Sequence, residues 1–358
     1  MNDDGVESDA ESGVAHQNGA DSFRCTYLLP IRRVRADGRE AADFARYFER
    51  LARAGCEVLV VDGSPPEVFD AHDDAWRGAC RHVRVNPKYA YLNGKVNGVH
   101  TGVDLARSER IVLADDDIRY TSGDIARACE LLDRYEMLRP QNYLAPLPVW
   151  GRMEAARMLI NRGVLRTGDY PGTCAFRRST CLRVGHYDGD VLFDNEEIVR
   201  HFAVQGASVG YARDFFIHKR PSTLRKWMEQ RPRQAYEDFV MRAKTALFMS
   251  LVPLALLLGA LVSVRAALAF VAVVACGAML LAARGLLTDG AYKFFPAHVL
   301  LYAPLWVLER ALSVYWALYW RVARGGYPFG DRLLSKGTGR SWVAGGRAVR
   351  RELNGRTR

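Results

Sequence analysis

The sequence predicts an α/β domain that is followed by an α-helical membrane region. The α/β domain is indicated by apolar runs of strand length that alternate with amphipathic segments from residue 25 onward. The membrane region is indicated by two stretches, 245–264 and 266–283, that contain no charged residue. Each stretch has about the length that an α-helix needs to cross a hydrocarbon layer of roughly 30 Å.

The alternation of strands and helices is most regular between residues 25 and 116. CEVLVVD (56–62) is a continuous apolar run, typical of a strand that is buried on both faces of a parallel sheet. REAADFARYFERLARAG (39–55) places its apolar residues on one face of a helix. Such units are joined by right-handed crossovers, and their ligands bind beyond the carboxyl ends of the strands. The other predicted elements are strand 25–31, strand 81–86, helix 91–108 and strand 110–116.

The two uncharged stretches are expected to form a hairpin that turns near residues 263–265, because one straight helix through both would overshoot a bilayer. A third apolar stretch, 297–320, carries Glu309 and Arg310 near its middle. A central charge costs about 2.5–3.5 kcal/mol on insertion scales, so its many aromatic residues favour a helix lying in the membrane interface. A third span in which Glu309 pairs with Arg310 is the alternative.

The charge distribution orients this region. The net charge is +10, and residues 321–358 alone hold ten Lys and Arg against two acidic residues. The basic residues flanking the hairpin lie on one side of the membrane if the hairpin crosses it twice, which is the positive-inside arrangement. This predicts a multi-pass protein of the cell membrane with its N-terminal domain and basic tail in the cytoplasm. The flanking basic residues are Arg242, Lys244, Arg284 and Lys293.

Composition excludes some partners and cofactors. Residues 1–22 are acidic and poor in large apolar side chains, so they are predicted to be disordered. The chain lacks zinc-finger, RNP and basic-heptad signatures, so we expect no nucleic-acid partner. Its seven cysteines show no CxxC pairing and are interpreted as reduced thiols in a cytosolic compartment.

Three consecutive carboxylates, Asp115, Asp116 and Asp117, directly follow the apolar residues 111–113. Adjacent carboxylates repel each other at neutral pH, so positive charge must compensate them. Two acids spaced i, i+2 beyond a strand end offer the hard oxygen ligands that suit Mg²⁺ or Mn²⁺ carrying substrate phosphates. A solvated acidic turn is the alternative interpretation.

The segment GKVNGVHTGVDLARSERIVLADDDI (94–118) resembles the part of family 2 glycosyltransferases that ends in their DxD motif. The resemblance implies an inverting, A-type glycosyltransferase domain over residues 23–240, with a mixed, mostly parallel nucleotide-sugar-binding sheet, before a membrane region over 241–320. It also implies that two of the aspartates bind Mg²⁺ or Mn²⁺, with Asp116 between them on the donor side. Lys95 is expected to meet the diphosphate of the donor, and a solvated helix lysine is the alternative. The matching positions are Gly94, Lys95, Asn97, Gly98, Asp115 and Asp117.

Two further stretches resemble the donor-binding parts of this family. VVDGS (60–64) resembles the stretch after the second strand, which implies that Asp62 contacts the base or ribose of the nucleotide. LLPIRR (28–33) resembles the loop after the first strand that frames the base, which implies that Pro30 and Arg32 lie there.

Other stretches resemble the acceptor side of the family. GTCAFRRS (172–179) resembles the segment beneath the acceptor, and QRPRQ (230–234) resembles the QxxRW motif with Gln230 and Arg233 in place. Gln follows Arg233 where the family has Trp, which argues against processive polymerisation. His218 lies where many enzymes of this fold carry a metal-binding histidine, and a surface histidine is the alternative.

The catalytic base is expected within FDNEEIVRHF (193–202), which lies where the family places an acidic pair at the start of a helix. In the preferred register Asp194 is the base and Asn195 is its neighbour. Glu196 or Glu197 is the base in a shifted register. Acids at a helix N-terminus that only complement the helix dipole are a further interpretation.

The sequence therefore predicts a membrane-anchored glycosyltransferase that is metal-dependent and inverting. Its donor is expected to be a nucleotide-diphosphate sugar, with UDP-sugars favoured, and its acceptor a lipid, a lipid-linked molecule or a glycan, as in glycolipid or polysaccharide biosynthesis. Two alternatives stay open: a nucleotidyltransferase that releases pyrophosphate, and a catalytically inactive membrane scaffold that binds glycans.

Overall fold

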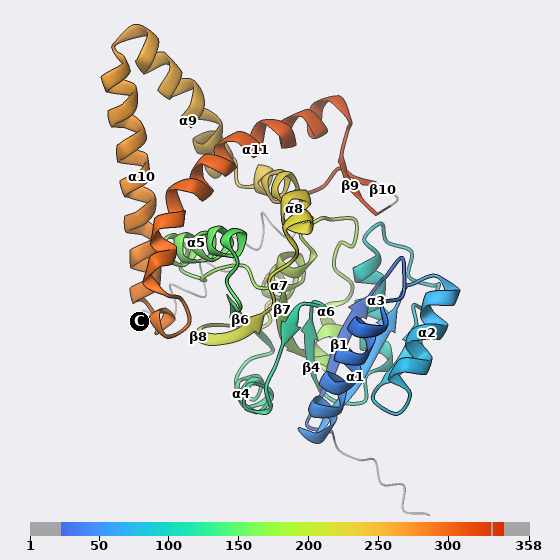
Figure 1. Ribbon diagram of the computed structural model, residues 1–358. Coiled ribbons are helices and arrows are strands. Elements are labelled where there is room, and N and C mark those ends of the chain that lie inside the picture. The colour runs from blue at the N-terminus through green and yellow to red at the C-terminus, as the bar shows by residue number, and fades with distance from the viewer. Residues whose placement is uncertain (1–22, 331, 340–358) are drawn as a thin grey trace, which may run out of the picture.

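The computed structural model describes residues 23–330 and 332–339 of the 358-residue chain. The N-terminus predicted to be disordered, 1–22, and the last part of the basic tail, 340–358, lie outside the described residues. Within the described part, an α/β domain is followed by long helices and a small hairpin, as Figure 1 shows.

A mixed sheet of eight strands forms the centre of the domain. The strands are β1 (Cys25–Ile31), β2 (Cys56–Asp62), β3 (Arg81–Arg84), β4 (Arg110–Ala114), β5 (Ile118–Arg119), β6 (Met137–Leu144), β7 (Thr173–Arg177) and β8 (Val209–Lys219). Their order across the sheet is β3-β2-β1-β4-β7-β6-β8-β5. The pairs β3–β2, β2–β1, β1–β4 and β6–β8 are parallel, whereas β4–β7, β7–β6 and β8–β5 are antiparallel. The predicted α/β class and its mixed sheet are therefore confirmed.

Helices cover both faces of this sheet. The first face carries α1 (Gly38–Arg53), α2 (Pro66–Trp76) and α4 (Ser122–Leu132), and the second carries α3 (Gly94–Leu105), α6 (Arg178–Val184) and α7 (Asp194–Val204). Side chains alternate between the two faces along a strand, so Tyr27 and Leu29 of β1 enter the first core and Leu28 enters the second. Both cores are apolar, which explains why these strands read as continuous apolar runs.

A third apolar core joins the domain to the C-terminal helices. It contains residues of β6 and β8, of α5 (Val149–Val164), and of the three long helices α9 (Arg242–Leu261), α10 (Val264–Leu287) and α11 (Ala303–Ala323). The chain reaches these helices through α8 (Leu224–Glu237) and the short helix η1 (Asp238–Val240). The domain and the helical region therefore share one packed interface.

Helices α9 and α10 form a hairpin that projects from the domain (Figure 1). Both are long and apolar enough to cross a membrane. The chain breaks between them at Val262 and Ser263, close to the predicted turn, and the Ser263 hydroxyl accepts a hydrogen bond of 3.1 Å from the Ala266 backbone N–H. This side-chain cap lets α10 begin there without a glycine or proline.

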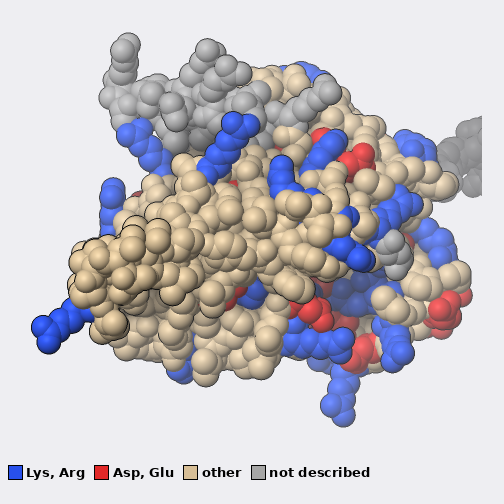
Figure 2. All heavy atoms as spheres, turned by 90° about the horizontal axis from the view of Figure 1, so that it is seen from above, with Lys and Arg blue, Asp and Glu red and all other residues tan. Residues whose placement is uncertain are grey.

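The surface of this hairpin is apolar and exposed. Figure 2 shows a broad uncharged area on the side of the molecule from which the hairpin projects, with Lys, Arg, Asp and Glu gathered around it. A large exposed apolar surface marks contact with a membrane or another protein. Among the exposed residues are Leu256, Leu257, Leu261, Val264, Leu268, Val273 and Leu280.

The third apolar stretch forms the short helix η3 (Ala297–Tyr302) and then α11. Arg310 of α11 is buried against α8, where its guanidinium lies 3.2 Å from the Asp238 carboxylate and donates to Gln234 Oε1 at 3.2 Å. The carboxylate that pairs with Arg310 is thus Asp238 of the domain, and not Glu309 as in the three-span alternative.

We predict that Gly285→Ala weakens the contact between α10 and α5. A methyl group at Gly285 would overlap the backbone carbonyl of Leu159, and one at Gly163 would overlap that of Leu281, so the two helices approach backbone to backbone. Because neither contact is with a flexible side chain, the helices must move apart, and we expect the free energy of unfolding to fall by about 1–3 kcal/mol. Thermal unfolding of the full chain in detergent measures this.

Gly277→Ala is the matched control, because nothing lies within 4 Å of a methyl group at that position of the same helix. Alanine favours helix over glycine by about 1 kcal/mol, so this variant should unfold at the wild-type temperature or above it. Equal unfolding temperatures for the two variants would contradict the close contact.

Candidate active site

The three aspartates lie where β4 ends, in the middle of the sheet between β1 and β7. The backbone fixes them at both sides: the Asp115 N–H donates to the Gly172 carbonyl at 2.9 Å, and the Asp117 carbonyl accepts from the Arg220 N–H at 2.8 Å. A methyl group at Gly172 would lie 2.5 Å from Asp115 Oδ2, so a larger residue there would displace the Asp115 carboxylate. The turn therefore brings three carboxylates together at one strand end.

Each aspartate has its own cation, and each cation comes from a different element. Lys95 Nζ of α3 lies 2.5 Å from Asp115 Oδ1, and Arg33, which follows β1, lies 2.7 Å from Asp116. Lys219 Nζ of β8 lies at 3.4 Å from Asp117, which is the longest of the three contacts. The mutual repulsion of the aspartates is thus compensated unequally.

Asp117 is the least compensated of the three. Its Oδ1 is buried and has no hydrogen-bond partner among the described residues. Burial raises the pKa of Asp117, and the charges of Asp115 and Asp116 add to this rise while Lys219 opposes it. An oxygen without a partner beside a second carboxylate is the donor set that a hard divalent cation prefers. The residues present therefore fit Mg²⁺ or Mn²⁺.

Asp116 shows the opposite behaviour. Burial alone would raise its pKa, but the positive charges of Lys226, Arg33 and Lys219 outweigh burial and lower it. Asp116 is therefore held as a carboxylate by the protein itself, with no need of a metal.

Lys95 connects the aspartate cluster to the start of α7. Its ammonium group lies 2.8 Å from Asp194 Oδ2 and donates to Asn195 Oδ1 at 2.6 Å. The Asn195 amide in turn donates to Asp115 Oδ2 at 3.1 Å. Burial would lower the pKa of Lys95, but the charges of Asp115 and Asp194 outweigh it and raise that pKa, so the lysine stays charged.

Of the three candidate bases, only Asp194 joins this network. Glu196 is buried and lies 2.9 Å from Arg200 and 3.2 Å from Arg139. Glu197 is also buried, and its Oε2 accepts from the backbone N–H of Gly339 at 2.9 Å. Successive helix residues point in directions about 100° apart, which is why only one of the three faces Lys95.

A cavity of about 620 Å³ opens beside Asp115 and Asp116, and we call it the strand-end cavity. Of the predicted donor-binding residues, Pro30, Arg32 and Lys95 line it together with these two aspartates. It is also lined by Val61, Gly63, Tyr91, Asn97, Phe329, Gly330 and Arg332.

The prediction that Asp62 contacts the nucleotide differs from what the structure shows. Val61 and Gly63 line the strand-end cavity, whereas Asp62, which lies between them, is 1% exposed. Its two oxygens accept from the Ser64 N–H at 2.8 Å and contact His72 at 2.7 Å. Neighbouring residues at a strand end face opposite sides, which turns this carboxylate away from the cavity.

The prediction of His218 as a metal ligand also differs, for the same reason. Lys219 reaches Asp117, so the preceding residue of β8 points to the other face. The His218 ring contacts the Ala145 carbonyl at 2.7 Å and lines a different cavity with Tyr47 and Arg119.

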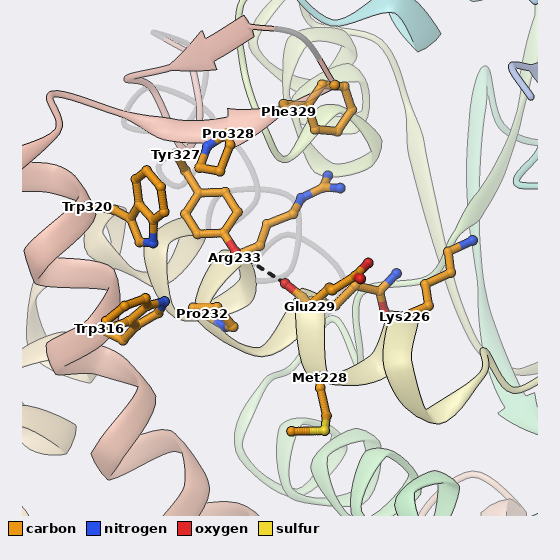
Figure 3. Close-up of a pocket in the computed structure, with 12 residues that line it drawn as sticks. Lys226, Met228, Glu229, Pro232, Arg233, Trp316, Trp320, Tyr327, Pro328 and Phe329 are labelled. Atoms are coloured by element: carbon orange, nitrogen blue, oxygen red, sulfur yellow. Dashed lines mark hydrogen bonds between the residues drawn. The ribbon is translucent and has the colours of Figure 1, made fainter. Parts of the chain in front are cut away.

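A second cavity, of about 670 Å³, lies between α8, α11 and the hairpin of β9 (Tyr327–Phe329) and β10 (Arg332–Leu334); we call it the aromatic cavity. Figure 3 shows Trp316 and Trp320 on one side of it and Glu229 and Lys226 on the other. The predicted residues Gln230 and Arg233 line it.

Arg233 lines the aromatic cavity and contacts three neighbouring parts of the chain. Its guanidinium donates to Glu237 at 3.0 Å and to the Leu192 carbonyl at 2.8 Å, and lies 4.7 Å from the centre of the Phe329 ring. Phe329 and Gly330 line both cavities, so the two cavities meet at the tip of the β9–β10 hairpin. Sequence reasoning missed this hairpin, because the predicted tail was judged only by its charge.

Comparison with known proteins identifies the fold. No protein-family model matches the chain, and no curated protein matches it. A mannosyltransferase from Pyrobaculum calidifontis, solved with GDP-mannose and Mn²⁺, has a TM-score of 0.50 at 19% identity over 82% of this chain and 88% of that chain. A glucosyl-3-phosphoglycerate synthase from Mycobacterium tuberculosis, solved with Mn²⁺, UDP and its product, has a TM-score of 0.37 at 14% identity over 56% and 74%. The first similarity shows that the chain has a glycosyltransferase A-type fold.

We predict that Asp117→Asn raises the thermal stability of the metal-free protein at pH 7. A carboxyl whose pKa is raised by folding destabilises the folded state when it is ionised, and this penalty disappears as the pH falls through its folded pKa. The amide removes the penalty at neutral pH. In the presence of a chelator, the unfolding temperature of Asp117→Asn should therefore lie a few degrees above that of the wild type.

Asp116→Asn is the matched control, and it should lower the unfolding temperature instead of raising it. The pKa of Asp116 is lowered by folding, so its ionised form stabilises the protein above its unfolded pKa, and the amide loses this contribution. Added Mn²⁺ should stabilise the wild type but not Asp117→Asn. Shifts of the same sign in both variants would contradict this description of the cluster.

Proposed function

We propose that this protein is a membrane-anchored, inverting glycosyltransferase of the family 2 type that depends on Mg²⁺ or Mn²⁺. The observation that carries the proposal is the unpartnered, buried oxygen of Asp117 beside Asp115, which itself lines a cavity large enough for a nucleotide. The shared fold with a glycosyltransferase supports it.

The strand-end cavity is proposed to bind the nucleotide-diphosphate sugar. Pro30 and Arg32 line the part of the cavity next to β1, and Lys95 and Asp115 line the part next to the aspartates. We therefore assign the base to the first part and the diphosphate to the second. Asp115 and Asp117 would hold the metal, which when bound supplies positive charge to the departing diphosphate.

The protein's own cations contribute beside the metal. Lys219 contacts Asp117 and Lys95 contacts Asp115, so both ammonium groups border the place assigned to the diphosphate. Fixed positive charge in a partly buried site stabilises a leaving group that gains negative charge. We assign this function to both lysines, and we do not assign metal binding to His218.

Asp194 is proposed as the base that accepts the proton of the acceptor hydroxyl. It is the one predicted acid of α7 that lies next to Lys95, and hence within the network of Asp115. An acceptor oxygen attacking the anomeric carbon gives up its proton to this carboxylate while the bond to the diphosphate breaks. A single displacement of this kind inverts the anomeric centre.

The aromatic cavity is proposed to bind the acceptor. It meets the strand-end cavity at Phe329 and Gly330, and it lies on α11, whose other end packs beside the α9–α10 hairpin. Its indole rings suit an apolar or sugar surface, and Gln230 and Arg233 supply hydrogen-bond donors. A lipid-linked or glycan acceptor that approaches along the cytoplasmic face of the membrane matches this position.

The activity is tested with a panel of UDP- and GDP-sugars, incubated with the purified chain and bacterial membranes as the source of acceptor. We expect release of nucleoside diphosphate with one donor when Mg²⁺ or Mn²⁺ is present, and none with a chelator. In the double variant Asp115→Asn/Asp117→Asn, the rate of nucleoside diphosphate release should fall by at least 100-fold. A loss on the order of this size is expected when the charge stabilisation by a metal is removed. Release of pyrophosphate from a nucleoside triphosphate would indicate a nucleotidyltransferase instead.

We predict that Asp194→Asn lowers kcat by about 100- to 10,000-fold, the usual contribution of a general base. Donor affinity should change less than kcat, because this carboxylate does not line the strand-end cavity and acts on the donor only through its ion pair with Lys95. Steady-state kinetics with the donor found above measure both quantities.

Glu196→Gln is the matched control for that variant. It removes an acid two residues along the same helix whose partners are Arg139 and Arg200, so it should lower the unfolding temperature but keep kcat per folded molecule within a few-fold. A larger loss of kcat in Glu196→Gln than in Asp194→Asn would show that the base is misassigned.

A further inference from the structure

A second group of metal-ligating side chains lies outside the candidate active site. Asp62 ends β2, His72 lies in α2 and His82 lies in β3. One ligand atom from each of these residues falls within 4.8 Å of the other two. Asp62 Oδ2 lies 2.7 Å from His72 Nδ1 and 3.2 Å from His82 Nε2. The side chains are between 0% and 4% exposed, so this is a buried cluster and not an acidic surface patch.

We propose that Asp62, His72 and His82 bind a zinc ion. Two imidazole nitrogens and one carboxylate oxygen are a donor set that suits Zn²⁺ and not Mg²⁺. Ligand atoms around a tetrahedral zinc with bonds of 2.0–2.1 Å lie about 3.3 Å apart. The two distances to Asp62 Oδ2 lie within about 0.6 Å of that value, so small side-chain rotations would bring these three ligands into place, and a water molecule would take the fourth position.

The surroundings of the three residues are those of a metal site. Asp73 Oδ1 contacts the second ring nitrogen of His82 at 3.0 Å, which is the carboxylate–histidine contact that orients metal-bound imidazoles. The remaining oxygen of Asp62 accepts from the Ser64 N–H at 2.8 Å, so only Oδ2 is directed at the cluster. The His72 ring stacks on Trp76 with centroids 4.3 Å apart, which fixes its plane.

The position of the cluster indicates what zinc does there. The three ligands come from consecutive elements, so the metal joins β2, α2 and β3 into one unit. Val61 and Gly63, on either side of Asp62, line the strand-end cavity. The proposed zinc is therefore structural, because it would stabilise the wall of that cavity from the opposite face of the sheet. It has no part in the chemistry proposed at Asp115 and Asp117.

The test is the metal content of the full-length chain after dialysis against Zn²⁺ and then against metal-free buffer, measured by inductively coupled plasma mass spectrometry. We expect about one zinc per chain. His72→Asn and His82→Asn should each lose it, and Asp73→Asn should weaken zinc affinity about 10- to 100-fold. A strong chelator should lower the unfolding temperature of the wild type, and Zn²⁺ should restore it.

Two control variants separate this site from others. His100→Asn removes another buried histidine, and Asp115→Asn/Asp117→Asn removes the proposed Mg²⁺ or Mn²⁺ ligands, so both should keep the zinc. If the histidine variants do not fold, the wild type loaded with Co²⁺ still decides, because tetrahedral N/O coordination gives visible absorption bands. The proposal would be overturned if the wild type bound no zinc and showed no such bands with Co²⁺. It would also be overturned if zinc were lost only in the Asp115→Asn/Asp117→Asn variant. Either result leaves the transferase assay unaffected.

Discussion

The central constraint on this molecule is the concentration of negative charge at the end of β4. Two carboxylates about 4 Å apart repel by roughly 4 kcal/mol at an effective dielectric constant of 20, so three in a row cannot be held without counter-charges. The fold brings Lys95 from α3, Arg33 from the loop after β1 and Lys219 from β8 to the three aspartates. The compensation is incomplete at Asp117, and this residual negative charge makes the strand end suitable for a dication.

Two strand ends of the same sheet carry two different kinds of polar site. Beyond β4 the proposed ligands are oxygens next to a cavity, as suits a metal that must meet a substrate. At the end of β2 the proposed ligands are a carboxylate and two imidazoles, whose side chains are buried on the other face of the sheet. The alternation of side chains along a strand separates the two sites: Val61 and Gly63 face the cavity, whereas Asp62 faces α2.

The C-terminal region is bound to the α/β domain by polar as well as apolar contacts. Arg310 of α11 is buried, pairs with Asp238 and donates to Gln234, and these contacts fix α11 against α8. Removing one partner of a buried pair leaves an uncompensated charge, so this contact restricts how α11 can move. Because α11 also carries the β9–β10 hairpin, the same contact places Phe329 at the junction of the two cavities.

Local pattern alone determined the order of strands and helices between residues 25 and 116, the acidic strand end, and the break between the two long apolar helices. These features follow from periodicity and charge, which are local properties of a chain. The family resemblance pointed in addition to Pro30, which together with Lys95 lines the strand-end cavity. Only the tertiary structure decided that Asp62 and His218 turn away, that Lys219 takes the place next to Asp117, and which acid of α7 meets Lys95. The facing of a side chain depends on strand register and helix rotation, and the meeting of residues more than 200 positions apart, as at Phe329, depends on packing. Neither quantity is encoded in any short stretch of sequence.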